Sequence, residues 1–502
     1  MKKTVEKEAF GDFQTPYPLA LEVCRVLVDQ GLSPASIVEP TCGKGAFLTA
    51  ALRCFPNAEA LGCDINAAYV STCQQAVASY PRCKVSVSDF FHADWQTILS
   101  GMADPMLVVG NPPWVTNAAL GNLGSSNLPE KTNFQGHRGV DAITGKSNFD
   151  ISEWMLLHLL EQLDGRNATL AMLCKTVVAR KVLQHAWKNN LQIKRAEIRP
   201  LDAATHFNAA VDACLFCCYL QPGKPSTDCH VYQGLSHADL RQTFGYHDGR
   251  LVADIELYEK WRHLLGESPY RWRSGVKHDC SKVMELSEIP QGLLNGFGER
   301  VGVEDECLYP MLKSSELANG KTQEPRRWMI ITQREIGHDT SILQFQAPKT
   351  WQYLVSHAEH LDKRGSSIYR KRPRFSIFGI GKYSFSSWKV AISGFYKSLM
   401  FVRIGPFRNK SIVLDDTCYL LACDNERESD FLHELLTSEP ATEFYSSLIF
   451  WDAKRPITTD LLSTLNLEAL AVEIGRGDDF KQYASRNPWT NKRAAVQPVL
   501  FD

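Results

Sequence analysis

The chain has 502 residues, 44% of them hydrophobic, which is enough to build the cores of two or more domains of ordinary size. Its 55 lysines and arginines balance 56 aspartates and glutamates, so the composition excludes a uniformly charged surface, and any anionic partner must meet a local patch. Fifteen scattered cysteines, no apolar leader and no run of roughly 18 apolar residues argue against a disulfide scaffold and a membrane partner, and predict a cytoplasmic protein with free thiols.

The N-terminal half predicts alternating helices and strands. The stretch YPLALEVCRVLVDQGL, which starts at residue 17, is amphipathic and predicts a helix that ends near Gly31. Short apolar runs predict strands at 36–39, 59–64, 83–89 and 106–110, with helical stretches after the first two. This alternation predicts an α/β fold with a doubly wound, mostly parallel sheet, whose ligands bind at the carboxyl ends of the strands.

A glycine loop follows the first predicted strand. PTCGKGAF places Gly43 and Gly45 just before a helix, and this arrangement presents backbone N–H groups to a ligand. The loop alone leaves both dinucleotides and S-adenosylmethionine open. It has neither GxGxxG spacing nor the GK[ST] of a P-loop, which favours a cofactor without a phosphate.

Acids close the predicted strands at regular spacing. Glu39, Asp64 and Asp89 lie about 25 residues apart, as the period of a βαβ unit requires. An acid at the end of the second strand can accept hydrogen bonds from ribose hydroxyls, and Asp89 can accept from an adenine amine. The alternative is that these acids only cap the helices that follow.

The run ACLFCCYL, residues 213–220, is rich in cysteine but apolar and aromatic throughout. Two of its thiols are adjacent and would point to opposite faces of a strand, which disfavours a zinc site. We expect these cysteines to pack as small hydrophobic side chains, and we predict no metal site.

Taken together, the motifs resemble the gamma-class amino-group DNA methyltransferases, the S-adenosylmethionine-dependent enzymes of bacterial modification systems. The likeness rests on FQTP at 13–16, EPTCGKGAF at 39–47, Asp64, SDF at 88–90 and NPPW at 111–114, in the order typical of that class. It is close over roughly residues 1–220 and implies a Rossmann-like methyltransferase fold. Glu39 and Lys44 depart from the family, which more often has Asp and Ser there.

The resemblance implies a set of contacts with S-adenosylmethionine. Thr15 is expected at the methionine end, Asp64 on the ribose hydroxyls, and Asp89 with Phe90 at the adenine. The full set of cofactor-binding residues is Thr15, Pro16, Glu39, Pro40, Cys42, Gly43, Gly45, Asp64, Asp89 and Phe90.

The NPPW turn suits methyl transfer to the exocyclic amine of a base. The Asn111 side-chain oxygen and the Pro112 carbonyl can accept the two amine hydrogens, which releases the nitrogen lone pair for attack on the methyl sulfonium. A base inside a duplex must first be flipped out, and we expect it between Trp114 and Phe207. An ordinary core position is the alternative for Phe207. The predicted catalytic residues are Asn111, Pro112, Pro113, Trp114 and Phe207.

A cluster of Pro, Gly and Ser at 221–228 predicts a domain boundary. We expect a catalytic domain over 1–228 and an α+β domain over 229–502 that more loosely resembles DNA target-recognition domains. Residues 362–410 hold 12 Lys or Arg against one acid, interleaved with ten aromatics, which is typical of a duplex-binding surface. A solvated basic face is the alternative. Candidate DNA contacts are Lys363, Arg364, Arg370, Lys371, Arg372, Arg374, Lys382 and Lys389.

We therefore expect a monomer that methylates the N6 amine of an adenine in a short double-stranded DNA sequence. Its expected setting is a restriction-modification or phage-defence system, with a separate restriction endonuclease as a further partner, because no PD…(D/E)xK nuclease constellation is evident. The alternatives are N4 methylation of cytosine, methylation of RNA or of a protein glutamine, and a catalytically idle DNA specificity subunit. FQTP before NPPW and the basic tract after it favour DNA.

Overall fold

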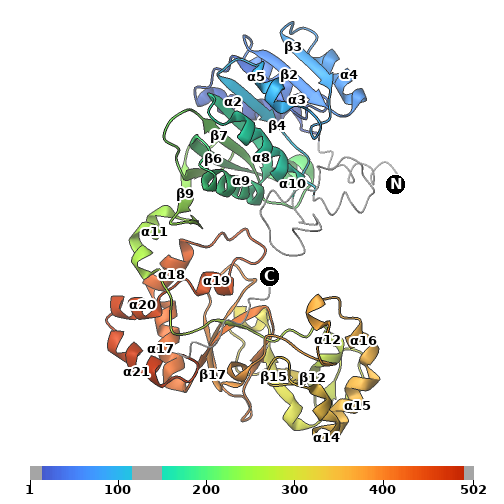
Figure 1. The fold of residues 1–502 in the computed structure, drawn as a ribbon, viewed down its shortest axis with the longest axis vertical. Coiled ribbons are helices and arrows are strands. Elements are labelled where there is room, and N and C mark those ends of the chain that lie inside the picture. Colours follow the sequence, from blue (N-terminus) through green and yellow to red (C-terminus); the bar gives the residue numbers. More distant parts are fainter. Residues whose placement is uncertain (1–13, 116–149, 491–502) are drawn as a thin grey trace. The chain divides into compact units, whose positions relative to one another are not determined.

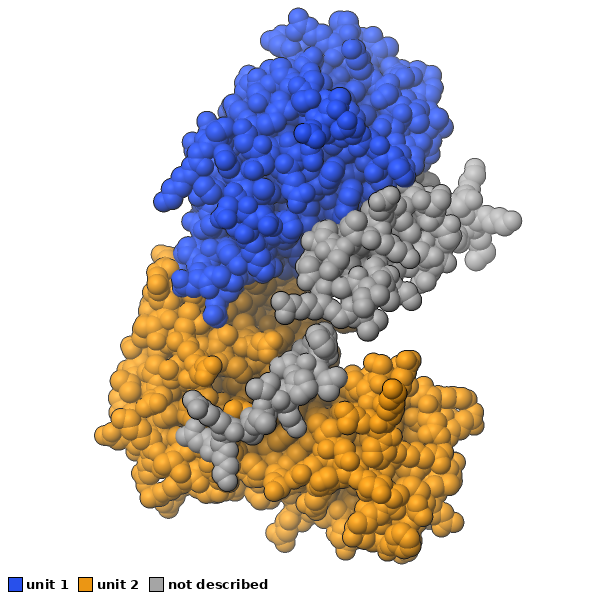
Figure 2. Space-filling view, in the orientation of Figure 1, with its two compact units in different colours: residues 1–255 blue, residues 256–502 orange. Residues whose placement is uncertain are grey.

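The structure, a computed structural model, describes residues 14–115 and 150–490. The chain divides into two compact units, residues 1–255 and 256–502, shown in blue and orange in Figure 2. None of the helices in the described residues has the length and apolar character that crossing a bilayer requires.

A ten-stranded sheet forms the centre of the first unit, with strand order β10-β9-β8-β6-β7-β5-β4-β1-β2-β3. Figure 1 labels several of its strands, among them β4, β6 and β7. Five neighbouring strands are parallel: β5 (Ala168–Lys175), β4 (Met106–Gly110), β1 (Ser36–Glu39), β2 (Glu59–Asp64) and β3 (Cys83–Val87). β7 (Ala213–Leu220) pairs antiparallel with β5 and with β6 (Ile193–Leu201). Every residue of β1 and β4 is buried, as expected for central strands that are covered on both faces.

Helices cover this sheet, and α2 packs against α3. The helices of the first unit are α2 (Tyr17–Asp29), α3 (Ala46–Cys54), α4 (Ala67–Ala76), α5 (Trp95–Ser100), α8 (Ile151–Leu163), α9 (Thr176–Lys188) and α10 (Ala203–Phe207). The predicted α/β fold is confirmed, and the predicted strands agree with β1 to β4. β3 ends two residues before Asp89, which lies in the turn that follows.

The boundary predicted after residue 228 lies inside the first unit. β8 (Asp228–Tyr232), β9 (Leu240–His247) and β10 (Arg250–Val252) continue the sheet, because β8 pairs in parallel with β6 and β9 pairs antiparallel with β8. The cluster at 221–228 is therefore the connection between β7 and β8. Its turn-forming composition marks a loop within a sheet as readily as a linker between domains.

Two smaller sheets and several helices form the second unit. The four-stranded sheet has the order β11-β20-β17-β18 and the six-stranded sheet has the order β14-β13-β12-β16-β15-β19. The strands are β11 (Arg273–Ser274), β12 (Glu285–Ile289), β13 (Gly292–Leu294), β14 (Arg300–Val301), β15 (Leu308–Leu312), β16 (Arg327–Ile330), β17 (Trp388–Ser393), β18 (Val402–Ile404), β19 (Val413–Leu414) and β20 (Cys418–Cys423). The helices are α11 (Ile255–Trp261), α12 (Ser281–Met284), α13 (Ser314–Ala318), α14 (Leu343–Gln346), α15 (Pro348–Ser356), α16 (Ala358–Asp362), α17 (Glu426–Thr437), α18 (Glu439–Ser446), α19 (Thr459–Leu462), α20 (Leu467–Glu473) and α21 (Gly477–Arg486).

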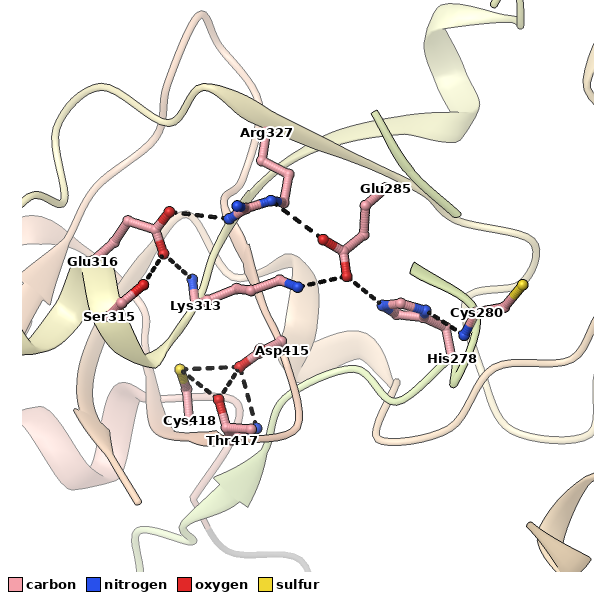
Figure 3. Close-up of polar contacts among 10 residues, drawn as sticks. All are labelled: His278, Cys280, Glu285, Lys313, Ser315, Glu316, Arg327, Asp415, Thr417 and Cys418. Carbon is pink, nitrogen blue, oxygen red and sulfur yellow. Dashed lines mark hydrogen bonds and ion pairs between the residues drawn. The ribbon is translucent and has the colours of Figure 1, made fainter. Parts of the chain in front are cut away.

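A partly buried cluster of charges surrounds Glu285 in the second unit (Figure 3). The Glu285 carboxylate lies 2.6 Å from Lys313 Nζ and 3.2 Å from both His278 Nε2 and Arg327 Nε. Burial acts to raise the pKa of Glu285, but the hydrogen bonds with His278 and Lys313 outweigh it and hold this pKa below its ordinary value. Arg327 also pairs with Glu316 at 3.0 Å, so charges of both signs alternate through the cluster. It connects β12 and β16 with the segment directly after β15.

Candidate active site

The glycine loop is fixed by an acid on the neighbouring strand. Gly43 and Gly45 have φ angles of +50° and +86°, a conformation that strains residues with a Cβ. Gly43 N donates to Asp64 Oδ2 at 2.8 Å, and Asp64 Oδ1 accepts from Asn66 N at 2.8 Å. Asp64 therefore holds the loop between β1 and α3 at the carboxyl end of β2.

Glu39 has a different environment from the other two strand-end acids. Its side chain is buried, and Oε2 accepts from Leu48 N at 2.8 Å, so it holds the first turn of α3. Burial raises the pKa of Glu39 well above its ordinary value. Its Cγ would lie 3.5 Å from a Cβ on Gly110, which places it beside the end of β4. Glu39 therefore caps the helix that follows it, which was the alternative to a role in cofactor binding.

Asp89 remains partly exposed in the turn after β3. Its Oδ1 accepts from Phe91 N at 3.0 Å, and its Oδ2 lies 2.7 Å from His92 Nδ1. Asp64 and Asp89 thus lie near the ends of adjacent strands, and both are more accessible than Glu39. Pro40 and Cys42, which precede Gly43 in the loop, are buried, and Cys42 N donates to Cys63 O at 2.7 Å.

Phe90 belongs to an aromatic cluster that includes residues from α8. Its ring centroid is 4.9 Å from Trp95 and 6.1 Å from Trp154. Trp154 and His158 stack with centroids 5.1 Å apart and an interplanar angle of 8°. Sequence reasoning missed these two residues. Their spacing of four residues on a helix was the available signal, but in an apolar helix it is not separable from core packing.

The segment before α2 carries the end of the FQTP motif, which contacts both the glycine loop and the NPPW turn. Thr15 Oγ1 accepts from Asn111 Nδ2 at 3.3 Å, and Gln14 Oε1 accepts from Lys44 N at 3.3 Å. Pro16 is exposed at the start of α2, and Phe13 lies outside the described residues. Three sequence motifs therefore meet at the carboxyl ends of β1, β2 and β4.

The NPPW turn follows β4 directly. Pro112 and Trp114 are buried, whereas Asn111 and Pro113 are partly exposed. Trp114 Nε1 donates to Leu173 O of β5 at 3.2 Å. Lys175, which sequence reasoning also missed, places Nζ 3.0 Å from the Trp114 carbonyl oxygen. The available signal was a lone lysine at the end of the apolar strand ATLAMLCK.

Trp114 and Phe207 contact each other in this structure. Their ring centroids are 5.1 Å apart with an interplanar angle of 69°, and both side chains are buried. A base stacked between two parallel rings needs them about 7 Å apart, which is twice the contact distance of carbon atoms. The expected sandwich is therefore not formed here, because the rings already pack edge to face.

Six of the eight candidate DNA contacts in the basic tract are exposed: Lys363, Arg370, Lys371, Arg372, Arg374 and Lys382. Three of them form surface ion pairs: Lys363 with Glu359, Arg374 with Asp362, and Lys382 with Glu335. Such exposed pairs are weak and exchange readily for phosphate contacts.

The prediction for Lys389 as a DNA contact is wrong. This residue lies in β17 between β18 and β20, and its side chain is 0% exposed. Arg364 is only partly exposed, and its guanidinium donates to the carbonyls of Leu361, His278 and Ser376 and covers the Tyr369 ring. Both residues serve the interior of the second unit rather than its surface.

Comparison with known proteins covers both units. Over 472 residues the chain is 43% identical to the type II methyltransferase M.NspV of Nostoc sp. (strain ATCC 29411 / PCC 7524), an alignment of 93% of this chain and 98% of that protein. Among solved structures, the type IIL restriction-modification enzyme MmeI in complex with DNA matches with a TM-score of 0.50 and 11% identity, over 97% of this chain and 70% of MmeI. No family model matches. The likeness to MmeI concerns the fold.

Proposed function

The chain belongs to the type II methyltransferases, and on that premise we propose that it transfers a methyl group from S-adenosylmethionine to the N6 amine of an adenine in double-stranded DNA. The observation that carries the proposal is the meeting of Thr15, Asp64 and Asn111 at one edge of the sheet. The description of MmeI as a restriction-modification enzyme solved in complex with DNA supports DNA as the substrate.

The residues at this edge fit S-adenosylmethionine. Its ribose hydroxyls and adenine amine are donors, and Asp64 and Asp89 offer acceptor oxygens at the ends of adjacent strands. A Cβ on Gly43 would come within 2.9 Å of the Gln14 side chain, so glycine there lets the segment with Thr15 close over the loop. When bound, the cofactor supplies an activated methyl group; Thr15 would lie at its methionine end and Phe90 near its adenine.

Asn111 and Pro112 would activate the base amine. The hydrogen bond from Asn111 Nδ2 to Thr15 holds the amide plane in one orientation, and the proline ring fixes the backbone of the turn. The Asn111 side-chain oxygen and the Pro112 carbonyl would accept the two amine hydrogens, so that the nitrogen lone pair is no longer delocalised into the ring. Much of the rate would come from positioning the two reactants.

The contact between Trp114 and Phe207 changes how the flipped base is expected to bind. We propose that the base stacks on Trp114 while Phe207 supports the indole from the side. Because Trp114 is buried, base entry requires the side chains that cover it to move.

The second unit is the proposed target-recognition domain, and its exposed basic residues would contact phosphates. A separate restriction endonuclease is the proposed partner of a monomeric enzyme. N4 methylation of cytosine is the second candidate reaction, because a cytosine amine needs the same two acceptors. Asn at the first position of NPPW favours adenine, since the N4-cytosine enzymes more often carry Ser there.

Asn111→Ala tests the proposed chemistry. We expect the wild-type chain to transfer labelled methyl groups from S-adenosylmethionine to bulk unmethylated DNA. The variant should lose at least about 100-fold of this rate, because one of the two acceptors is gone, while cofactor affinity measured by calorimetry stays within about threefold. Long-read sequencing of DNA from cells that express the chain would identify the base and the recognition sequence. Absence of label in DNA, or equal loss of cofactor binding in Asn111→Ala, would contradict the proposal.

A further inference from the structure

A lysine outside the recognised motifs contacts the NPPW turn. Lys175 is the last residue of β5. The pairing of β5 with β4 ends at Gly110 and Met172, so the lysine lies beyond that pairing, although it still pairs with Ala213 of β7 on the other side. Its Nζ lies 3.0 Å from the carbonyl oxygen of Trp114 and 2.6 Å from Asp150 Oδ2. The Lys175 side chain is 24% exposed and that of Asp150 only 8%, so this ion pair is shielded from water far more than a surface pair.

Asp150 is itself firmly held. It caps the N-terminus of α8, where its Oδ1 accepts from Ser152 N at 3.1 Å and from the Ser152 hydroxyl. The next residue, Ile151, donates its backbone N–H to Val115 O at 2.9 Å. The start of α8 therefore contacts the chain directly after the NPPW turn and also anchors the lysine.

The turn is thus fixed at both ends. On one side, Asn111 Nδ2 donates to Thr15. On the other, the Trp114 indole donates to Leu173 O and the Trp114 carbonyl accepts from Lys175. The bond from Lys175 is the charge-assisted one, and such bonds are about twice as strong as neutral ones.

We propose that Lys175 is a positioning residue for methyl transfer, an inference that rests on the function proposed above. Its ammonium group, oriented by Asp150, holds the Trp114 backbone. Pro113, whose φ is fixed by its ring, separates Trp114 from Pro112, so a shift of the Trp114 carbonyl is passed to the Pro112 carbonyl. Lys175 thereby keeps that acceptor, and the indole on which the base would stack, in the geometry that the reaction needs.

A neighbouring ion pair provides a matched control. Lys181 of α9 pairs with Glu153 of α8 at 3.1 Å. This pair also joins the segment after β5 to α8, but its hydrogen bond goes to the Glu153 carboxylate rather than to the NPPW turn. Lys181→Met removes a charge from the same region without removing the hydrogen bond to Trp114.

The test compares Lys175→Met, Lys175→Arg and Lys181→Met in the full chain. Hydrogen exchange of the Trp114, Val115 and Ile151 amides reports on the turn, and kcat and KM for unmethylated DNA report on the reaction. We expect Lys175→Met to accelerate exchange at these amides and to lower kcat about 10- to 100-fold, with KM and the calorimetric Kd for S-adenosylmethionine within about threefold. Lys175→Arg should restore part of kcat, and Lys181→Met should behave as wild type.

Two results would overturn the proposal: unchanged exchange in Lys175→Met, or an equal loss of kcat in Lys181→Met. If Lys175→Met does not fold, Asp150→Asn replaces it, because Asn still caps α8 but no longer offers a negative charge to the lysine. That variant should show the same two changes to a smaller degree, and wild-type exchange and kcat in it would overturn the proposal. A wild-type chain that leaves DNA unlabelled would refute the proposed function, whereas the exchange measurement still decides whether Lys175 holds the turn.

Discussion

At the scale of single residues, Lys389 shows how strongly position in a sheet can determine the state of a side chain. β17 is a central strand, and every residue from Lys389 to Ser393 is buried. The ammonium donates to the Ser386 carbonyl, and burial lowers the pKa of Lys389 to about 7. Keeping a charge in this environment costs solvation energy that a single hydrogen bond does not offset.

Lys389→Met should therefore stabilise the protein, and more so at acidic pH. The ordinary pKa of lysine, 10.5, applies to the unfolded chain, while the folded pKa is about 7. The stability lost through Lys389 is greatest below pH 7 and disappears as the pH rises towards 10.5, so removing the amine helps most at low pH. Lys389→Met should raise the free energy of unfolding at both pH values. The increase at pH 6 should exceed the increase at pH 9 by about 1–3 kcal/mol.

Urea unfolding at the two pH values measures this difference. Lys382→Met is the control, because Lys382 belongs to the same basic tract but its side chain is 78% exposed. A gain in Lys389→Met that is equal at both pH values would show that the charge is not the cause.

At the scale of elements, the glycine loop between β1 and α3 depends on two separate requirements. Both glycines have positive φ, which alone costs a residue with a Cβ roughly 1–2 kcal/mol. A Cβ on Gly45 would also come within 2.5 Å of the Cys73 sulfur, so the loop could not keep its distance from α4. The glycines were recognisable from sequence, but the contact with Cys73 depends on how α4 packs.

Gly45→Ala should weaken cofactor binding, and backbone strain alone should not account for the loss of affinity. The matched control is Gly31→Ala, since Gly31 also has a positive φ, +82°, but a Cβ there would meet nothing within 4 Å. We expect both variants to lose about 1–2 kcal/mol of stability from strain, and Gly45→Ala to lose more because of the clash. Only Gly45→Ala should raise the Kd for S-adenosylmethionine, by at least about tenfold, in calorimetry. Equal Kd values for the two variants would contradict a role of the loop in cofactor binding.

At the scale of the whole molecule, the proposed reaction needs both units. The meeting point of the three motifs lies in the first unit, and the exposed basic residues 370–372 lie in the second. In the proposed function the first unit carries out methyl transfer while the second binds the duplex. Each has its own core, so changes on the surface of the second should leave the chemistry of the first intact.

A triple variant, Arg370→Gln with Lys371→Gln and Arg372→Gln, should weaken DNA binding because fewer phosphates are neutralised. The slope of log affinity against log salt should fall by about 0.9 for each phosphate that is no longer bound, while kcat at saturating DNA stays close to wild type. Fluorescence anisotropy with a duplex at several salt concentrations measures the slope. Lys481→Gln with Arg486→Gln removes exposed charges of α21 as the control. An unchanged slope in the triple variant would identify residues 370–372 as a solvated basic face.

The sequence alone was sufficient for those features that depend on neighbours along the chain. Apolar runs and turn residues placed β1, β2 and β4, and the glycine loop was recognisable because positive φ favours glycine. The thiols of ACLFCCYL were correctly expected in a buried strand. The NPPW turn was recognisable because stability alone does not explain Asn, Pro and Trp directly after a buried strand, which indicates a functional role.

Tertiary structure decided what each side chain meets. Glu39 is buried at the start of α3, and Lys389 is buried within the second unit. Trp114 and Phe207 contact each other, and the sheet continues past residue 228. Lys175 and Asp150, 25 positions apart, form an ion pair, and Lys175 also donates to the Trp114 carbonyl. Local pattern specifies the type of an element, because periodicity and backbone preference act over a few residues. Contacts between distant residues depend on strand order and on packing in three dimensions, which no single stretch of sequence encodes.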